Sequence, residues 1–420
     1  MSPVQIFQSL FNTESFQNGS LVSLKPGQLL YGRVEKFLPN DTAIIQIGNV
    51  KLLAHVKASL STTDHYWFEV RSNGDDGIQL KVVEGQGNQP SHLLEEHFKL
   101  SETKITGQLL QSFLERNVPF TKEQLRTSIT WINHDGDISQ EITALEWMMK
   151  KDLPFTKQTF QSLVAVQESA SFSSQLEEIG RYLEDPKFAS FKTTEPLKQM
   201  IATIFENHII DKVSTGTDVK QMLQSMVHQL GLEYEKEVKN TQKLIELHSL
   251  KPLLMSAIHE LGTNGRELEP VLNRLTGMQL IAQDPIGQMQ QMVMQLPISF
   301  RETQTDVTLQ WSGRKTKNGK IDPDYCRILF YLDLQNLKQT VVDMQIQNKL
   351  IHVSVLNDTK EIESIVPVLT PTLKEKLENL GYKLSFIKVI PFSENKKMVL
   401  LRINSSNVLS EYYQGVDIKI

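Results

Sequence analysis

Several runs of the 420-residue chain have the residue types of metal or phosphate sites, and their spacing decides whether they can act as such. His92 and His97 flank two glutamates, as in a zinc-binding helix. Residues five apart lie about 140° around a helix axis, whereas ligands four apart share one face. The spacing therefore favours a solvated helix start over a zinc site.

Three other candidates depart from the motif that they approach. Residues 313–320 are similar to a phosphate-binding loop, but the gap between the glycines is one residue too long and Ile321 replaces the magnesium-binding Ser or Thr. We expect a basic hairpin tip there, with a contact to an acidic partner as the alternative. Residues 135–139 begin like a calcium loop, but Gln140 occupies the glycine position.

Cys326 stands next to a strand-like run and has no histidine near it in the sequence, which favours an inert thiol over a nucleophile. The nucleophile elbow and the dinucleotide-binding fingerprint do not occur. We therefore expect no catalytic residues, no cofactor and no metal, and a protein that is not an enzyme.

Composition narrows the class of protein further. The length predicts two to four domains, and a hydrophobic content of 40% allows most of the chain to fold. A net charge of -5 gives no general attraction to nucleic acid or anionic membranes. A single cysteine excludes an internal disulfide. No apolar run reaches the ~20 residues of a membrane helix, so a cytoplasmic protein without membrane insertion is expected.

The pattern predicts a multi-domain α+β protein that begins with a flexible leader (1–20) and a small OB-like or SH3-like β-barrel (21–84). Five short strand-like runs support the barrel: 29–37, 43–47, 50–56, 67–71 and 78–83. Tyr31, Phe37, Tyr66 and Trp67 could stack on nucleic-acid bases. Equal numbers of basic and acidic residues in this region leave no electropositive groove, which favours roles in the core or in protein contact.

A helical region is expected over 91–275, after a linker at 85–90. A short repeat, 118–122 and 153–157, places a proline after an apolar helix and a threonine that can cap the next helix. Two copies are fewer than a solenoid needs. Methionines at helical spacing between Val219 and Leu230 predict a core face, and Gly231 ends that helix.

The last part, 285–395, combines alternating strands with one long helix. Two-residue alternation predicts strands at 292–298, 307–311, 328–332, 342–346, 351–355 and 384–390. Helical spacing runs from Ile362 to Leu380, and Gly381 ends the helix. We expect this helix to pack on the sheet and close a core. An extra strand within 396–420, at 398–403, is also expected.

Residues 327–390 resemble the C-terminal domain of the flagellar hook-length control protein family. The family's last motif, Leu-Pro-x-Leu-Arg-x-x-Leu-x-x-x-Gly-Leu-x-Leu, is filled from its proline onward, without a gap, by Pro371, Leu373, Lys374, Leu377, Gly381 and Leu384. Leu337 takes the place of the leucine that precedes a glycine in the family. Val355 stands where a strand of the family ends near an aromatic residue. Lys338 replaces the glycine, Thr370 replaces the leucine before the proline, and the proline expected near Leu334 is absent.

The resemblance implies a protein-interaction component that binds the export-gate switch protein of the flagellar type III secretion apparatus. In the family, that contact changes export from hook to filament substrates. The pattern of residues 20–275 predicts a folded barrel and helices. In the family, this part of the chain is usually extended and measures the length of the hook. A cytoplasmic multi-domain adaptor without a role in hook length is the alternative, and a nucleic-acid binder acting through the barrel is a weaker one. Export, if it occurs, is expected to use the type III route.

We expect partner contact at two exposed turns. The residues assigned to that contact are Leu334, Leu337, Lys338, Asn348 and Lys349. Recognition residues commonly lie on loops that a rigid sheet positions. The residues expected to form the core of the C-terminal domain are Val342, Val353, Val355, Leu373, Leu377, Gly381 and Phe386.

Overall fold

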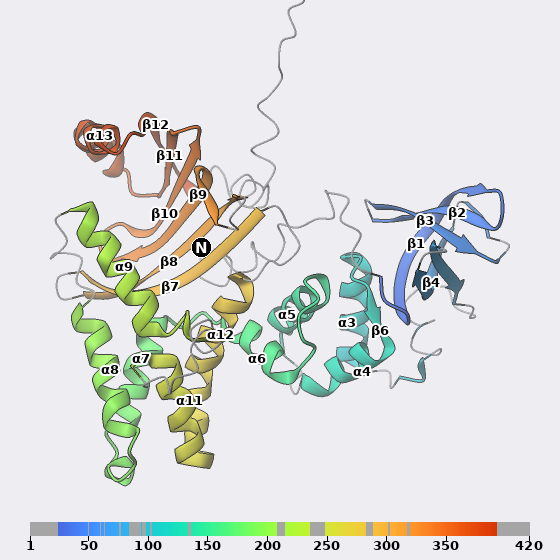
Figure 1. Cartoon of the computed structure of the whole chain (residues 1–420), viewed down its shortest axis with the longest axis horizontal. Coiled ribbons are helices and arrows are strands. Elements are labelled where there is room, and N and C mark those ends of the chain that lie inside the picture. The colour runs from blue at the N-terminus through green and yellow to red at the C-terminus, as the bar shows by residue number, and fades with distance from the viewer. Residues whose placement is uncertain are drawn as a thin grey trace, which may run out of the picture. The chain divides into compact units, whose positions relative to one another are not determined.

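The chain is a multi-domain α+β protein that divides into two compact units between Phe160 and Gln161, here the first and the second unit (Figure 1). The computed structural model describes residues 24–48, 50–58, 60–62, 64–74, 77–83, 94, 98–100, 103–132, 136–207, 215–235, 248–282, 289–300, 303–316 and 320–392. The leader, the 85–90 linker and the strand expected at 398–403 lie outside the described residues.

The first unit begins with a closed five-stranded barrel, as the alternating runs predicted. Its strands are β1 (Gln28–Leu38), β2 (Thr42–Ile47), β3 (Val50–Val56), β4 (His65–Gly74) and β5 (Gly77–Val82). The order is β2-β3-β5-β4-β1, and β1 returns to pair with β2. Only the β3–β5 pairing is parallel among the pairings of these strands. Val34, Ile45, Phe68 and Val70 fill the interior and are fully buried.

Helices follow the barrel in the first unit: α3 (Lys104–Glu115), α4 (Lys122–Trp131), α5 (Ser139–Lys150) and α6 (Lys157–Ala165), in which the division falls. The short strand β6 (Phe120–Thr121) pairs with β1. Thr121 and Gln124 form the expected capping box at the start of α4. Trp67 packs edge-on against Phe120, with ring centroids 6.0 Å apart. An aromatic side chain of the barrel is thus covered by the segment that leads into α4.

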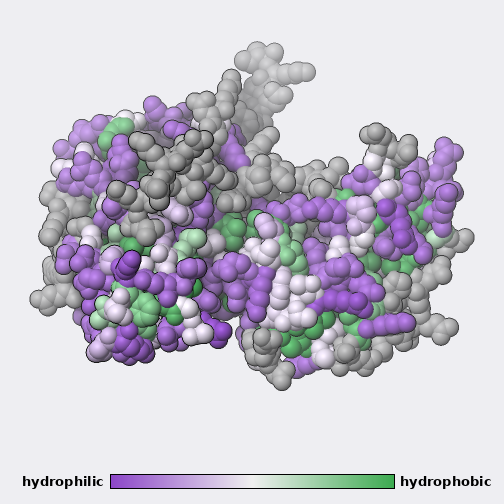
Figure 2. Space-filling view, turned by 60° about the horizontal axis from the view of Figure 1, so that its bottom comes forward, coloured by the Kyte–Doolittle hydropathy of each residue, from purple (hydrophilic) through white to green (hydrophobic). Residues whose placement is uncertain are grey.

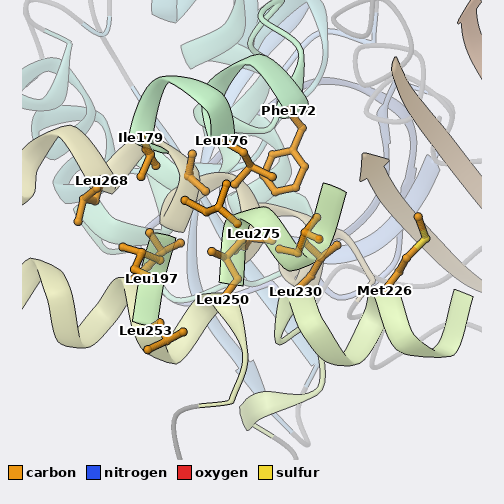
Figure 3. Close-up of a cluster of buried hydrophobic side chains, with 14 of the residues drawn as sticks. Phe172, Leu176, Ile179, Leu197, Met226, Leu230, Leu250, Leu253, Leu268 and Leu275 are labelled. Atoms are coloured by element: carbon orange, nitrogen blue, oxygen red, sulfur yellow. The ribbon is translucent and has the colours of Figure 1, made fainter. Parts of the chain in front are cut away.

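The second unit contains a layer of helices that packs on one sheet. The helical elements are α7 (Phe172–Tyr182), η1 (Pro186–Phe188), α8 (Thr194–Asn207), α9 (Gly216–Leu230), α11 (Leu250–Leu261), η3 (Gly262–Leu268), α12 (Glu269–Ala282) and α13 (Ile362–Asn379). Side chains of α7, α8, α9, α11 and α12 converge in one core (Figure 3). Met226 and Leu230 are fully buried, and Met222 packs against the same core, which confirms the methionine face. Val219, at the start of the predicted face, is exposed instead. Gly231 ends α9 with φ 74°, as predicted.

Gly277 permits a close approach between α12 and the part of α6 after Phe160, which belongs to the second unit. A Cβ atom at this position of α12 would lie 2.3 Å from the carbonyl oxygen of Ser162 on α6. No side chain fits at that distance, so the backbones of α6 and α12 can approach only because residue 277 is glycine.

Six strands form the sheet of the second unit: β7 (Met289–Phe300), β8 (Thr303–Lys315), β9 (Ile321–Leu334), β10 (Lys338–Gln347), β11 (Leu350–Leu356) and β12 (Lys383–Ile390). The order is β12-β11-β10-β9-β8-β7, and every neighbouring pair is antiparallel except β11 and β12, which α13 connects. The strands predicted within 285–395, including the 292–311 hairpin, and the 362–380 helix are all present.

The domain boundary differs from the one expected near residue 285. Leu296, Val307 and Leu309 of the sheet belong to the same buried core as Leu176, Leu254 and Leu275 of the helices. The helices from α7 onward therefore belong with the sheet, and α3 to α5 belong with the barrel. Helical periodicity shows that a helix has an apolar face, but it does not show which sheet that face covers.

Candidate partner-binding surface

The two turns that the sequence assigned to partner contact lie far apart in the structure. Leu334, Leu337 and Lys338 lie in the β9–β10 turn, and Asn348 and Lys349 lie in the β10–β11 turn. The two turns are at opposite ends of β10, which has 10 residues. At about 3.3 Å per residue they are roughly 30 Å apart. One small contact cannot contain both turns.

A buried asparagine holds the β9–β10 turn in place. The side-chain amide nitrogen of Asn357 donates to the carbonyl oxygens of Leu337 (2.7 Å) and Gln339 (3.1 Å) and to the hydroxyl of Thr340 (2.7 Å). Lys338 adopts φ 54°, a conformation that glycine takes without strain. Asn357 was not among the expected residues, although its place directly after a strand is a usual one for a turn-forming side chain.

The β10–β11 turn is tight and exposed. Asn348 and Lys349 have φ 48° and 65°, the two consecutive left-handed residues of a two-residue hairpin turn. The backbone N–H of Asn348 donates to the carbonyl of Asp324 (2.8 Å), and that of Lys383 donates to the carbonyl of Lys349 (2.9 Å). The second bond connects the turn to the first residue of β12, with three residues between it and the end of α13.

The C-terminal end of α13 is fixed on the sheet as the sequence predicted. Gly381 has φ 81°, and its N–H donates to the carbonyl of Glu378 (2.9 Å), while the N–H of Tyr382 donates to that of Leu377 (2.9 Å). These two bonds form a Schellman cap. Leu377 and Tyr382 both pack on the core that includes Val353.

The rest of the expected apolar face of α13 is exposed, which corrects the prediction that it is buried on the sheet. Leu369, Leu373 and Leu380 are 59%, 38% and 72% exposed, and only Ile362 of this helix is fully buried. Most of the large apolar side chains that are exposed in the described part of the chain lie between Leu350 and Phe386. Helical spacing places these residues on one side, but it does not show how much of that side the sheet covers.

Phe386 is the second correction, and a β-bulge explains it. Leu384 pairs with Ile351, whereas Phe386 pairs with His352, so Ser385 is an extra residue in β12. Beyond the bulge, Ile387 is in register with Val353 and Phe386 lies on the opposite face, 45% exposed. An inserted residue reverses the alternation that a strict two-residue period predicts.

The expected core valines do lie on one face of the sheet. Val342 is in register with Val355, and Val353 is in register with Met344. Val353 is buried, while Val342 and Val355 are half-buried. On this face, Val353 is buried at the centre, and the half-buried Val342 and Val355 lie in the same cluster as Leu377 of α13.

A fully buried arginine in the second unit was missed. The guanidinium of Arg274 donates to the side-chain oxygens of Gln295 (2.6 Å) and Gln175 (2.9 Å) and to the carbonyl of Ala170 (2.7 Å). Burial lowers the pKa of Arg274, and the carboxylates of Asp306 and Glu168 oppose that shift.

Asp306 also caps the start of α7. Its carboxylate accepts hydrogen bonds from the N–H groups of Phe172 and Ser173 and from the hydroxyl of Ser173. The arrangement fixes α7 and α12 to strands β7 and β8, and no sequence motif marks it.

The phosphate-loop-like run, Cys326 and the calcium-loop-like run have structural roles in the residues that the structure describes. Residues 313–316 and 320 belong to the β8–β9 hairpin, and Gly313 is required because a Cβ there would lie 2.9 Å from that of Cys326. Burial raises the pKa of the Cys326 thiol, which disfavours the thiolate. Asp137 accepts hydrogen bonds from Ser139 at the start of α5.

His92 and His97 lie outside the described residues. Within the described ranges no three acidic, histidine or cysteine side chains gather as metal ligands would. No helix in the part of the chain that the structure describes combines the length and the apolarity needed to cross a membrane. In the view of Figure 2, polar residues cover much of the coloured surface, with smaller apolar groups between them.

Comparison with known proteins gives a partial relative. The chain is 33% identical over 180 residues to an uncharacterized protein, YlqG, of Bacillus subtilis. The match covers 42% of this chain and 30% of that protein. No family model matches, and no solved structure matches.

Proposed function

We propose that this protein is a protein-interaction component whose second unit binds the cytoplasmic domain of an export-gate switch protein, as the resemblance to hook-length control proteins implies. The exposed apolar side of α13 carries the proposal that this unit binds a protein. Exposed apolar residues that gather on one element are typical of interaction sites. The protein is cytoplasmic in this proposal and has no catalytic role.

Two features support the hook-length control part of the proposal. Lys338 has a positive φ at the position where the family pattern has glycine. Gly381 has a positive φ at the family's second glycine, and Leu377 of the same motif packs on the sheet. The motif positions thus have the backbone conformations that a Gly-containing pattern requires.

A retention experiment tests the proposal. The immobilised full-length chain should retain the purified cytoplasmic domain of a flagellar export-gate switch protein. Lys338→Glu should weaken retention while the melting temperature stays unchanged, whereas Lys220→Glu, an exposed change on α9, should have no effect. Failure of the wild-type chain to retain the domain would refute the proposed partner.

The adaptor alternative predicts the same binding but no export. Detection of the full-length chain in culture medium, with residues 1–20 still present, would support export by the type III route. A protein found only in cells, yet bound to the switch domain, would favour the adaptor.

For the first unit we infer a barrel of the OB kind, because β1, β2, β3, β5, β4 and β1 again follow one another around it. Nucleic-acid binding is the less favoured function for this barrel. Trp67 is buried, Tyr66 packs on the barrel core and Tyr31 stacks on His65, which leaves Phe37 as the one exposed side chain of the four aromatics, at 43%. Oligonucleotide binding that falls steeply with salt would reverse this preference.

A further inference from the structure

The sheet of the second unit also buries apolar side chains on the face that points away from its helices. In the described part of the chain, the buried members are Leu329, Tyr331, Val341 and Leu356, here the back-face cluster. Phe330 packs against the core of the helices, so its neighbours Leu329 and Tyr331 point to the opposite face. Val341 pairs with Tyr331 and with Leu356, so these three side chains form a row across β9, β10 and β11.

This cluster needs a cover that the sheet cannot provide. Side chains stand roughly perpendicular to a sheet, so neighbours on one face shield their sides but leave their outer ends open to water. Tyr331 is nevertheless only 5% exposed, and its burial raises the pKa of its hydroxyl. Within the described ranges, the apolar side chains of the cluster come only from β9 to β12 and from Phe392, directly after β12. The apolar layer over them therefore comes from a part of the chain outside those ranges.

The chain leaves β12 on this face. The N–H of Phe392 donates to the carboxylate of Asp358 (2.8 Å), and the side chain of Phe392 packs on the back-face cluster. An apolar run, Met-Val-Leu-Leu-Arg-Ile at 398–403, follows after five residues. The six residues from Phe392 to Met398 can span about 20 Å, whereas β9 lies three strands from β12, or about 14 Å. The run can therefore reach the whole cluster.

We propose that the apolar run 398–403 crosses this face of the sheet and covers the back-face cluster. The free edge of β12 is the other place for the run, but a strand added there would leave the cluster open. The leader also contains apolar side chains, at Ile6, Phe7, Leu10 and Phe11, but no described contact brings it to this face. The inference is independent of the proposed partner, because it concerns the face of the sheet opposite α13.

Thiol labelling tests the cover in a chain whose own Cys326 is replaced by Ser. Val341→Cys should react slowly with a thiol reagent in the full-length chain and at least about tenfold faster in a chain that ends at Phe392. Gln345→Cys is the control, because Gln345 lies on the same face of β10 but is half-buried. It should react at similar rates in both chains. Val341→Cys that stays protected in the shorter chain would overturn the proposal.

A second variant keeps the full length, in case the shorter chain does not fold. Leu400→Asp with Leu401→Asp should increase the labelling rate of Val341→Cys by about tenfold, because carboxylates oppose packing on an apolar cluster. Ser405→Asp with Ser406→Asp is the matched control, since it adds the same charge just after the run. Equal labelling rates in the two double variants would overturn the assignment to 398–403.

Removal of residues 1–20 separates the two candidate covers. The full-length Val341→Cys chain should remain protected when only the leader is removed. Loss of protection in that chain, with 393–420 intact, would assign the cover to the leader and overturn the proposal. Retention of the switch domain is measured separately, so failure of the proposed partner leaves the labelling result unchanged.

Discussion

At the scale of single residues, Leu377 and Leu369 differ in burial although they belong to the same apolar stripe of α13. Leu377 packs on the sheet, whereas Leu369 is 59% exposed. Leu377→Asp should lower the free energy of unfolding by about 2–4 kcal/mol, because it places a carboxylate against an apolar core. Leu369→Asp should change the free energy of unfolding by less than about 0.5 kcal/mol. Urea unfolding of the two variants measures the difference. Equal losses would contradict the observed burial.

Arg274 is the second residue whose environment predicts a large effect. Arg274→Met should cost about 3 kcal/mol, since it leaves the buried oxygens of Gln295 and Ala170 without their donor. Arg314→Met is the control, because Arg314 is exposed beside the ring of Tyr325. Urea unfolding that shows the same stability for Arg274→Met as for the parent would mean that the buried hydrogen bonds contribute nothing net.

Residue environments were the part of the structure least accessible from the sequence. Leu373 and Leu377 have the same residue type and helical spacing, yet the sheet covers only one of them well. Arg274 was missed because its partners come from segments that are far apart in the chain. The positive-φ position of Gly381, in contrast, was predictable because it depends on local backbone geometry.

At the scale of elements, the start of α8 depends on a carboxylate from α11. Glu260 accepts hydrogen bonds from the N–H groups of Lys192 (2.9 Å) and Thr193 (3.0 Å) and from the Thr193 hydroxyl (2.6 Å). The hydroxyl of Thr193, followed by the N–H of Lys192, lowers the pKa of Glu260 below its ordinary 4.5. The stabilisation is therefore complete above about pH 4.5 and is lost as the pH falls through the lower folded-state pKa.

Glu260→Gln tests this element because it removes the titrating group. The variant should be less stable than the parent at neutral pH, and the difference should shrink as the pH falls below 4.5. Thermal unfolding across that range measures it. Glu177→Gln, an exposed change on α7, should leave the pH profile unaltered. A constant difference between Glu260→Gln and the parent at every pH would contradict the lowered pKa.

Strands and helices were predictable because their periods are local. The barrel strands, the C-terminal strands and α13 all occur where two-residue and helical periods placed them. The bulge at Ser385 was not predictable, because nothing in the residue types shows that β12 contains one residue more than its partner. Assignment of the helices to a domain depended on contacts between distant segments, which a period does not contain.

At the scale of the whole molecule, the shared core of helices and sheet predicts how the chain divides. A fragment that begins at Gln161 should fold, because it contains the helices and strands of the second unit. A fragment that begins at Met289 should not fold, because removing the helices exposes Leu296, Val307 and Leu309. Circular dichroism and thermal unfolding of both fragments check this. Cooperative unfolding of the shorter fragment would contradict the shared core.

A chain cut between Ala282 and Met289 provides a matched test. Its two pieces should elute together from a sizing column under native conditions, because α7, α8, α11 and α12 remain packed on β7 to β9. Separation of the pieces without denaturant would instead support a boundary near residue 285.

The extra residue at Ser385 has a genetic consequence. In-frame loss of one codon between Leu384 and Phe386 would restore strict alternation along β12. Phe386 would still pair with His352 and Ile387 with Val353, so no side chain after the deletion would change face. Loss of one codon after Phe386, where β12 and β11 already match residue for residue, would instead exchange the faces of all the residues that follow. Loss of the Ser385 codon should therefore be tolerated far more often than loss of a codon later in β12.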